Sequence, residues 1–442
     1  MKRAITLMVS LIFFLTIILA GCGTSKQESS NNVQTQETQK QITLRFSWWG
    51  DDTRHQATLE AIKLFEQKYP NIKIKAEYAG WDGYLDKQTT QIAGGTAADI
   101  MQINWNWLPI FSKDGNGFYD LNKLSKELGL EENYTKNILE LGTVNGKLNG
   151  IPVALTGRVI YYNKTVYDKF GVSTFPTTWN DLINIAKKFD KGYYPMILGD
   201  YDAWLLSMTY AIQKTGKPFI DNNGKLAFDE NDIKIALDFY KKLIDNKVTP
   251  TIATIANEGG NGNAPIEQLP SFIDGKFAGL FQWTSAVKKD ATPLKEKNME
   301  LALGGIPMDS DSKTSGAILK PSMLFAINKD CKYPKEAATF LNFILNDPEG
   351  VKAMGLNRGI PVSKSAVDTL QKAGLISGLE YDGLKFLLDH PSVPISPYLE
   401  DPKLQDVYRQ TIDQISYGKV TVDEAAKYMY DNVQKVLSEI TK

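Results

Sequence analysis

The stretch that decides the fold runs Ile42-Thr-Leu-Arg-Phe-Ser-Trp-Trp-Gly-Asp-Asp-Thr-Arg-His55. Its first residues alternate apolar and polar side chains, which is the pattern of a strand with one buried face. Apolar residues then recur every three or four positions until Pro70, so the sequence predicts a strand, a loop and a helix. In open α/β sheets, loops at the carboxyl ends of strands line the ligand crevice. Trp48 and Trp49 stand at that point, and they are predicted either to contact a ligand or to pack in the core.

Similar strand and helix patterns follow along the chain. Residues 72–78 alternate apolar side chains with Lys and Glu, which predicts a second strand. Alternation of strands and helices predicts an α/β fold, in which helices cover both faces of a sheet. The other predicted segments are helices over Trp81–Ile92, Trp179–Phe189 and Pro334–Leu345, strands over Asp99–Asn104 and Met323–Ile327, a turn at Asp221–Gly224, and a last helix capped by Thr421 and Glu424.

Charge and composition exclude several classes of function. The chain has 442 residues, with 50 Lys+Arg against 51 Asp+Glu, so it lacks the basic footprint of a nucleic-acid-binding protein. Two histidines are too few for a His-rich zinc site, and no metal or cofactor is predicted. Tryptophan is more informative, because five of the eight cluster near the start and suggest a stacking surface: Trp48, Trp49, Trp81, Trp105 and Trp107.

The first 40 residues read as an export and anchoring segment. Lys2 and Arg3 precede an apolar run over residues 7–20 that ends in Leu-Ala-Gly-Cys22, which is typical of a lipoprotein signal. We expect a signal peptide over residues 1–21, lipid on Cys22 and a flexible tether over residues 22–40, which is rich in Ser, Gln, Asn and Thr. An uncleaved membrane anchor is the alternative. Cys331 would then be a lone, inert thiol.

Catalytic motifs are weak. Ser285 with Lys288 and Ser310 with Lys313 match a Ser-x-x-Lys pattern, but no Lys-Thr-Gly companion exists. Asp221–Gly224 resembles the start of a calcium loop, but the twelfth position carries Asp232 in place of Glu, so the segment is interpreted as a turn. Whether calcium assists ligand binding stays open. A pair of carboxylates could serve a glycosidase, so a secreted lipidated glycosidase is one alternative.

Long motifs give the chain a family resemblance from Ile42 to the C-terminus. It resembles the extracellular solute-binding proteins of ABC importers, in the carbohydrate branch. The marks are the lipobox, Gly146-Lys-Leu-Asn-Gly-Ile-Pro152, Tyr161-Tyr-Asn163 and Lys335-Glu-Ala-Ala-Thr-Phe-Leu-Asn-Phe343. A narrower resemblance, to oligogalacturonide-binding proteins, rests on Phe46-Ser-Trp-Trp-Gly50 with Arg54, Gly80-Trp-Asp-Gly-Tyr-Leu85, Ala98-Asp-Ile-Met-Gln-Ile-Asn-Trp-Asn-Trp107, Phe111-Ser-Lys-Asp-Gly-Asn-Gly-Phe-Tyr-Asp120 and Arg158-Val-Ile-Tyr-Tyr-Asn163.

The resemblance implies a fold and a set of partners. The fold would be a two-lobed, periplasmic-binding-protein-like α/β fold of the Venus-flytrap type, with hinge crossovers and the ligand between the lobes. Lobe 1 would comprise residues 41–157 and 317–358, and lobe 2 residues 158–316 and 359–442. The protein would be a monomer without enzymatic activity. The lipobox departs from the soluble periplasmic members of the narrower family, so we expect lipid to hold this protein on the outer face of a Gram-positive cell membrane. It would pass its oligosaccharide to the permease subunits of an ABC importer.

A site for such a ligand needs aromatic planes and convergent polar groups. We expect Trp48, Trp49, Trp105 and Trp283 to supply planes, with Trp81 and Trp107 as second choices. The carboxylate of a uronic acid calls for arginine, whose planar fork can bond both oxygens. Arg158 is the first choice because no acidic residue lies within five positions of it. The remaining candidates are Arg54, Arg358, Lys320 and Asn104. A neutral plant oligosaccharide is the alternative ligand, and a surface ion pair is the alternative role for each cation.

Overall fold

The computed structural model describes residues 41–441 apart from residue 222 and residues 261–264. The predicted signal peptide, Cys22 and the tether lie outside the described residues. Residues from Gln41 onward form one compact unit. In that part of the chain, none of the helices is long and apolar enough to cross a membrane.

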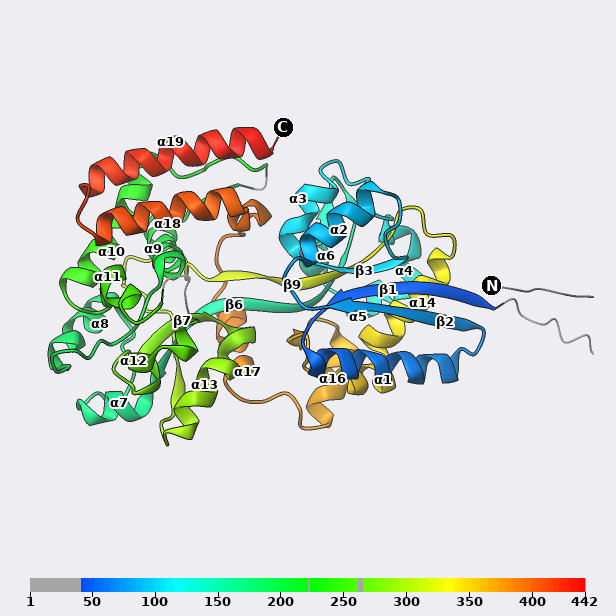
Figure 1. Cartoon of the computed structure of the whole chain (residues 1–442), viewed down its shortest axis with the longest axis horizontal. Coiled ribbons are helices and arrows are strands. Elements are labelled where there is room, and N and C mark those ends of the chain that lie inside the picture. Colours follow the sequence, from blue (N-terminus) through cyan, green and yellow to red (C-terminus); the bar gives the residue numbers. More distant parts are fainter. Residues whose placement is uncertain (1–40, 222, 261–264, 442) are drawn as a thin grey trace, which may run out of the picture. The chain divides into compact units, whose positions relative to one another are not determined.

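The N-terminal strand, loop and helix form as predicted. β1 (Ile42–Trp49) leads into α1 (Asp52–Lys68), whose N-cap Asp51 accepts a hydrogen bond from the backbone N–H of Arg54. β2 (Ile72–Ala79) and β3 (Ile100–Ile103) both pair with β1 in parallel. Figure 1 shows α1 on one side of these strands and α2 on the other. The elements that follow are α2 (Tyr84–Ala93), α3 (Leu108–Phe111), α4 (Ser125–Leu128), α5 (Leu130–Asn133), α6 (Lys136–Glu140), β4 (Thr143–Val144) and β5 (Lys147–Leu148).

The middle of the chain is mostly helical. Thr178 caps α8, and the turn at Asp221 closes through a hydrogen bond from the Gly224 N–H, so both predictions are confirmed. The elements are β6 (Ile151–Asn163), α7 (Lys164–Lys169), α8 (Trp179–Ile185), α9 (Asp200–Thr215), α10 (Glu230–Asp245), α11 (Ile252–Ala256), α12 (Pro270–Ile273), β7 (Gly279–Trp283), α13 (Val287–Glu296) and β8 (Leu301–Gly305).

The last third contains one further long strand and a series of helices. Thr421 and Glu424 form the predicted capping box of α19. The elements are β9 (Ile318–Ile327), α14 (Pro334–Asn346), α15 (Pro348–Met354), β10 (Ile360–Pro361), α16 (Lys364–Lys372), α17 (Leu379–Asp389), α18 (Pro402–Ser416) and α19 (Val422–Ile440). Short 3-10 helices include η1 (Trp105–Trp107), η5 (Thr284–Ala286) and η6 (Pro397–Glu400).

The strands join in one sheet through the two longest of them. β6 pairs with β9 from Ile151 to Arg158, and its second half pairs with β7 and β8. β9 in turn pairs with β3, which lies beside β1. β6 and β9 therefore run from the N-terminal strands to the strands of the helical region, and Figure 1 shows them crossing between these two groups of elements.

Two large hydrophobic cores lie on either side of these crossing strands. One gathers side chains of β1 to β3, α1 and α14, and it includes Phe46, Phe65 and Phe340. The other gathers side chains of α8 to α10, β7, α18 and α19, and it includes Trp204, Tyr240 and other aromatic residues. Each core is large enough to hold its own set of helices on the sheet, so the fold is a two-lobed α/β fold of the periplasmic-binding-protein type.

Candidate functional site

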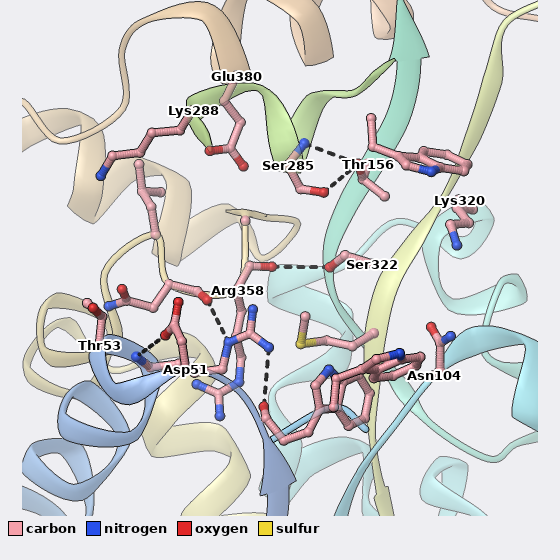
Figure 2. A pocket seen from close by; sticks show the side chains of 18 residues that line it. Asp51, Thr53, Asn104, Thr156, Ser285, Lys288, Lys320, Ser322, Arg358 and Glu380 are labelled. Atoms are coloured by element: carbon pink, nitrogen blue, oxygen red, sulfur yellow. Dashed lines mark hydrogen bonds between the residues drawn. The ribbon is translucent and has the colours of Figure 1, made fainter. Parts of the chain in front are cut away.

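A cavity of about 460 Å³ lies where the two groups of elements meet. Its wall takes residues from the carboxyl ends of β1 and β3, from the crossing strands β6 and β9, and from η5, α13 and α17. Figure 2 shows Glu380 and Lys288 on the side of the cavity opposite Arg358. The predicted site residues in the wall are Trp49, Arg54, Trp81, Asn104, Trp283, Lys320 and Arg358.

Trp48 is placed in the core and not at the cavity. Its side chain is fully buried, and its indole Nε1 donates to Nδ1 of His55 at 3.1 Å. Its ring packs against Phe46 and Tyr78, with centroids 4.9 and 5.0 Å away. Successive side chains of a strand point to opposite faces, so Trp48 packs beneath α1 while Trp49 reaches the cavity.

Trp105 also lies outside the wall. It is 3% exposed, and its Nε1 donates to the carbonyl oxygen of Leu141 at 2.9 Å. Trp107 is buried as well, but it backs the aromatic wall, because Trp81 stacks on it at 5.9 Å with 14° between the ring planes. Trp81 is 51% exposed. Of this tryptophan cluster, Trp81 is exposed, and Trp81 and the buried Trp49 both line the cavity.

Arg158 is the third predicted residue that the structure places elsewhere. It is 4% exposed, and its Nη1 lies 2.5 Å from Oδ1 of Asp202 and 2.7 Å from the carbonyl oxygen of Phe281. Arg158 pairs with Trp283 across β6 and β7, and its guanidinium packs on the Trp283 ring. The acid that occupies it comes from α9, 44 positions away along the chain, so a search for local acids could not find it.

Arg54 and Arg358 form a pair of cations in the wall. Arg54 donates from Nε to the carbonyl oxygen of Asn357 at 2.8 Å and from Nη1 to that of Trp49 at 3.2 Å. Arg358 is 4% exposed and donates from Nε to Gln102 at 2.8 Å and from Nη1 to Thr58 at 3.0 Å. All of these acceptors are neutral.

This pair carries charge that no carboxylate neutralises. Among the described residues, neither arginine forms an ion pair, and the Nη2 atom of Arg358 is buried without a hydrogen-bond partner. Burial lowers the pKa of both guanidiniums, and Arg54 lowers the pKa of Arg358 further by repulsion. Asp51 favours the charged form of Arg54 from a distance. Two cations that repel each other and donate to neutral groups can accept an anion between them on chemical grounds.

Lys320 differs from the arginines because it is already paired. Its ammonium lies 2.5 Å from Oε2 of Glu400 on η6, and both side chains are almost buried. The same nitrogen lies 4.7 Å from the centre of the Trp283 ring. Lys320 therefore supports the aromatic wall, while its charge is cancelled by Glu400.

The comparisons with known proteins place the chain in a family. Residues 50–351 match the family of bacterial extracellular solute-binding proteins, which is more than half of the chain. The chain belongs to this family. It is 40% identical to a periplasmic oligogalacturonide binding protein of Yersinia enterocolitica, solved with saturated digalacturonic acid, with a TM-score of 0.81 over 91% of this chain and 100% of that one.

Two further relatives of this solute-binding protein differ in what they do. A de novo designed esterase, improved by directed evolution and rational design, is 38% identical with a TM-score of 0.85, over 91% of this chain and 100% of that one. The arabinooligosaccharide-binding protein of Bacillus subtilis is 26% identical over 365 residues, 80% of this chain and 79% of that one.

Several residues of the cavity wall were not predicted from the sequence as ligand contacts. Ser285 and Lys288, noted only as a weak Ser-x-x-Lys match, both line the cavity, where the Ser285 hydroxyl lies 3.0 Å from that of Thr156. Glu380 lines the cavity, and Glu400 pairs with the wall residue Lys320. Neither had a signal in the sequence, because a carboxylate on a helical segment is ordinary in any sequence. Their importance comes from the crossing strands, which bring segments 80 to 300 residues apart to one cavity.

Proposed function

We propose that this solute-binding protein captures acidic oligosaccharides, namely oligogalacturonides from pectin, and delivers them to an ABC importer without turnover. The observation that carries the proposal is the arginine pair, Arg54 and Arg358, which faces the cavity and, among the described residues, forms no ion pair with a carboxylate. A uronic-acid carboxylate would accept hydrogen bonds from this pair and supply the missing negative charge.

The aromatic wall supports a sugar as the ligand. Sugars have apolar C–H faces and polar edges, and such ligands pack on aromatic rings while a few polar groups fix their orientation. Trp49, Trp81 and Trp283 supply the rings, and Asn104 and Thr156 stand among them as polar groups. The 40% identity to the Yersinia enterocolitica protein that binds digalacturonic acid supports the same chemistry.

The proposal includes closure of two lobes on the ligand. We divide the unit into residues 41–157 with 317–358, and residues 158–316 with 359–442. The two hydrophobic cores support this division along the crossing strands, because their membership changes between Val153 and Val159 on β6 and between Ile318 and Met323 on β9. α16 departs from the division, because it packs against α15 and α14. The proposal also includes a monomeric, extracellular protein held at a Gram-positive cell membrane by lipid on Cys22.

Binding measurements test the proposal. Purified protein is titrated with digalacturonic acid, its methyl ester and arabinobiose, using calorimetry and thermal shift, because a ligand of the folded state raises stability. We expect binding of the acid, at least tenfold weaker binding of the ester, and no stabilisation by the neutral sugar. Equal affinity for acid and ester would overturn the acidic ligand and favour a neutral one, as in the Bacillus subtilis relative.

Variants test whether the arginine pair is responsible for binding of the acid. Arg54→Gln removes one charged fork and should weaken acid binding by roughly tenfold, since a charged hydrogen bond contributes about 1.5–3 kcal/mol. Arg45→Gln is the matched control, because Arg45 lies on β1 in an ion pair with Glu77, outside the cavity wall. Shorter sugars in the mixture, detected by chromatography, would instead indicate a glycosidase.

A further inference from the structure

Glu380 is a carboxyl group in the cavity wall that lacks a partner. It stands in the first turn of α17, and among the described residues no hydrogen bond or ion pair engages its carboxylate. Its Oε1 atom lies 3.6 Å from the position that a Cβ on Gly359 would occupy. The carboxyl group therefore reaches the segment that carries Arg358, from the other side of the cavity (Figure 2).

The charges around Glu380 come from α13, from β6 and from α17 itself. Lys288 of α13 lines the same cavity and favours the ionised carboxylate, as does the N-terminus of α17 itself. Burial opposes them and raises the pKa of Glu380 to about 7. β8 and η5 contribute no charged side chain. The other titratable groups on the neighbouring elements are Lys289, Asp290, Lys295 and Glu296 of α13, and Arg158, Tyr161 and Tyr162 of β6. Asp382 lies on α17 itself and Arg358 lies beside β10.

We propose that Glu380 takes up a proton when an anionic ligand enters the cavity, and that the protonated carboxyl then donates a hydrogen bond to the ligand. The proposal rests on the acidic ligand proposed above. The one bond that forms is the carboxyl O–H, and its proton comes from solvent. Asp51, the other carboxylate in this wall, accepts the backbone N–H of Arg54 as the cap of α1. Among the described residues of the wall, Glu380 is the carboxyl that can accept a proton without giving up a hydrogen bond.

The direction of the effect follows from the charges. A ligand carboxylate bound at the arginine pair adds negative charge to the cavity, which disfavours the ionised form of Glu380 and raises its pKa above that of the free protein. A group whose pKa rises on binding stabilises the complex fully below its free pKa, and this contribution is lost as the pH rises. Affinity should therefore fall from pH 6 to pH 8.5.

The experiment measures proton uptake directly. Calorimetric titration with digalacturonic acid at pH 7, in two buffers with different ionisation enthalpies, gives the number of protons taken up per ligand. We expect up to about half a proton, since a group with a pKa near 7 is half protonated at that pH. A second series from pH 5.5 to 8.5 stays above the ordinary carboxyl pKa of about 4, so the ligand itself remains ionised.

Two variants isolate the carboxyl group. In Glu380→Gln the side-chain amide can still donate a hydrogen bond, but it does not ionise. The ligand affinity of this variant should therefore vary less with pH, and its proton uptake on binding should fall toward zero. Asp382→Asn is the matched control, because it makes the same charge change on the same helix at an exposed residue outside the wall. Burial also shifts the pKa values of His55 and Asp290, which could contribute to proton uptake. Their contributions cancel when the proton uptake of Glu380→Gln is subtracted from that of wild type.

The outcomes separate this inference from the proposed function. Strong binding of digalacturonic acid with no proton uptake, or with equal uptake in Glu380→Gln, would overturn the role of Glu380 and leave the acidic ligand intact. Failure of wild type to bind the acid at any pH would overturn both. A thermal-shift control shows whether Glu380→Gln remains folded, and a folded variant with wild-type uptake would again contradict the proposal.

Discussion

The guanidinium carbon of Arg158 lies 4.8 Å from the centre of the Trp283 ring, and the ammonium of Lys320 lies 4.7 Å from the same centre. Each cation is held by its own carboxylate, Asp202 for Arg158 and Glu400 for Lys320. Strand register explains the arrangement, because Arg158 is paired with Trp283 on one side and with Ile318, two residues before Lys320, on the other. Trp283 is therefore fixed by neutralised cations, and the unneutralised charge of the site stays with the arginine pair.

Replacing Arg158 should weaken the binding of every ligand by the same factor. The double variant Arg158→Met with Asp202→Asn removes the cation without leaving a buried charge unpaired, and it frees the Trp283 ring. A cation–π contact contributes about 0.5–2 kcal/mol, so we expect a loss of roughly 2- to 30-fold in affinity, proportionally equal for every ligand that wild type binds. Calorimetry on the double variant checks this. A loss confined to acidic ligands would mean that Arg158 contacts the ligand carboxylate itself.

Trp81 and Trp48 should behave in opposite ways. Trp81→Ala removes a half-exposed ring from the cavity wall, so affinity should fall while the free energy of unfolding changes by less than about 1 kcal/mol. Trp48→Ala creates a cavity beneath α1 and should cost about 3–5 kcal/mol of stability. Urea unfolding and ligand titration of the two variants provide the comparison. Severe destabilisation by Trp81→Ala would show that its ring belongs to the core.

Arg358→Met should separate stability from binding. The change removes a buried charge that no carboxylate neutralises, together with hydrogen bonds to Gln102 and Thr58. Since burying an unpaired charge is unfavourable, we expect the ligand-free protein to lose little or no stability, whereas the affinity for digalacturonic acid falls at least tenfold. Thermal unfolding with and without ligand measures both. A large loss of stability in the ligand-free variant would mark Arg358 as structural.

Cys22→Ala tests the anchoring proposal. The apolar run and the small residues before Cys22 predict lipidation, so the variant should accumulate unprocessed or appear in the medium. Fractionation of expressing cells, followed by immunodetection in membrane and medium, measures the distribution. Identical membrane fractions for variant and wild type would contradict lipid attachment at this residue.

Sequence periodicity predicted local structure well and long-range pairing poorly. The strand from Ile42, the helix after it and the capping box of Thr421 depend on neighbouring residues, and all of them form. The crossing strands could not be read in this way, because β6 is buried along its whole length and shows no alternation. The two-lobed fold was expected from family resemblance and not from the pattern of apolar residues.

The candidate site shows the same limit. The rule that loops at strand ends line a ligand crevice predicted Trp48 and Trp49 alike, but Trp49 lines the cavity while Trp48 lies in the core. Arg54 was predicted from a motif of the family resemblance, and it also lines the cavity. Arg158 could not be assigned from its neighbours, because its charge is cancelled by Asp202 of α9. Whether a cation is available to a ligand depends on its counterions, and these are set by tertiary structure.

Cys331 has a practical consequence for studying this protein. It is 8% exposed, and burial raises the pKa of its thiol to about 12, so at neutral pH it stays protonated and unreactive. A chain that starts at Gln41 lacks Cys22, so Cys331 is its one cysteine. A single Ser285→Cys change, at an exposed residue of the cavity wall, would then offer one reactive thiol. An environment-sensitive dye attached there would turn the protein into an optical sensor for the compounds it captures.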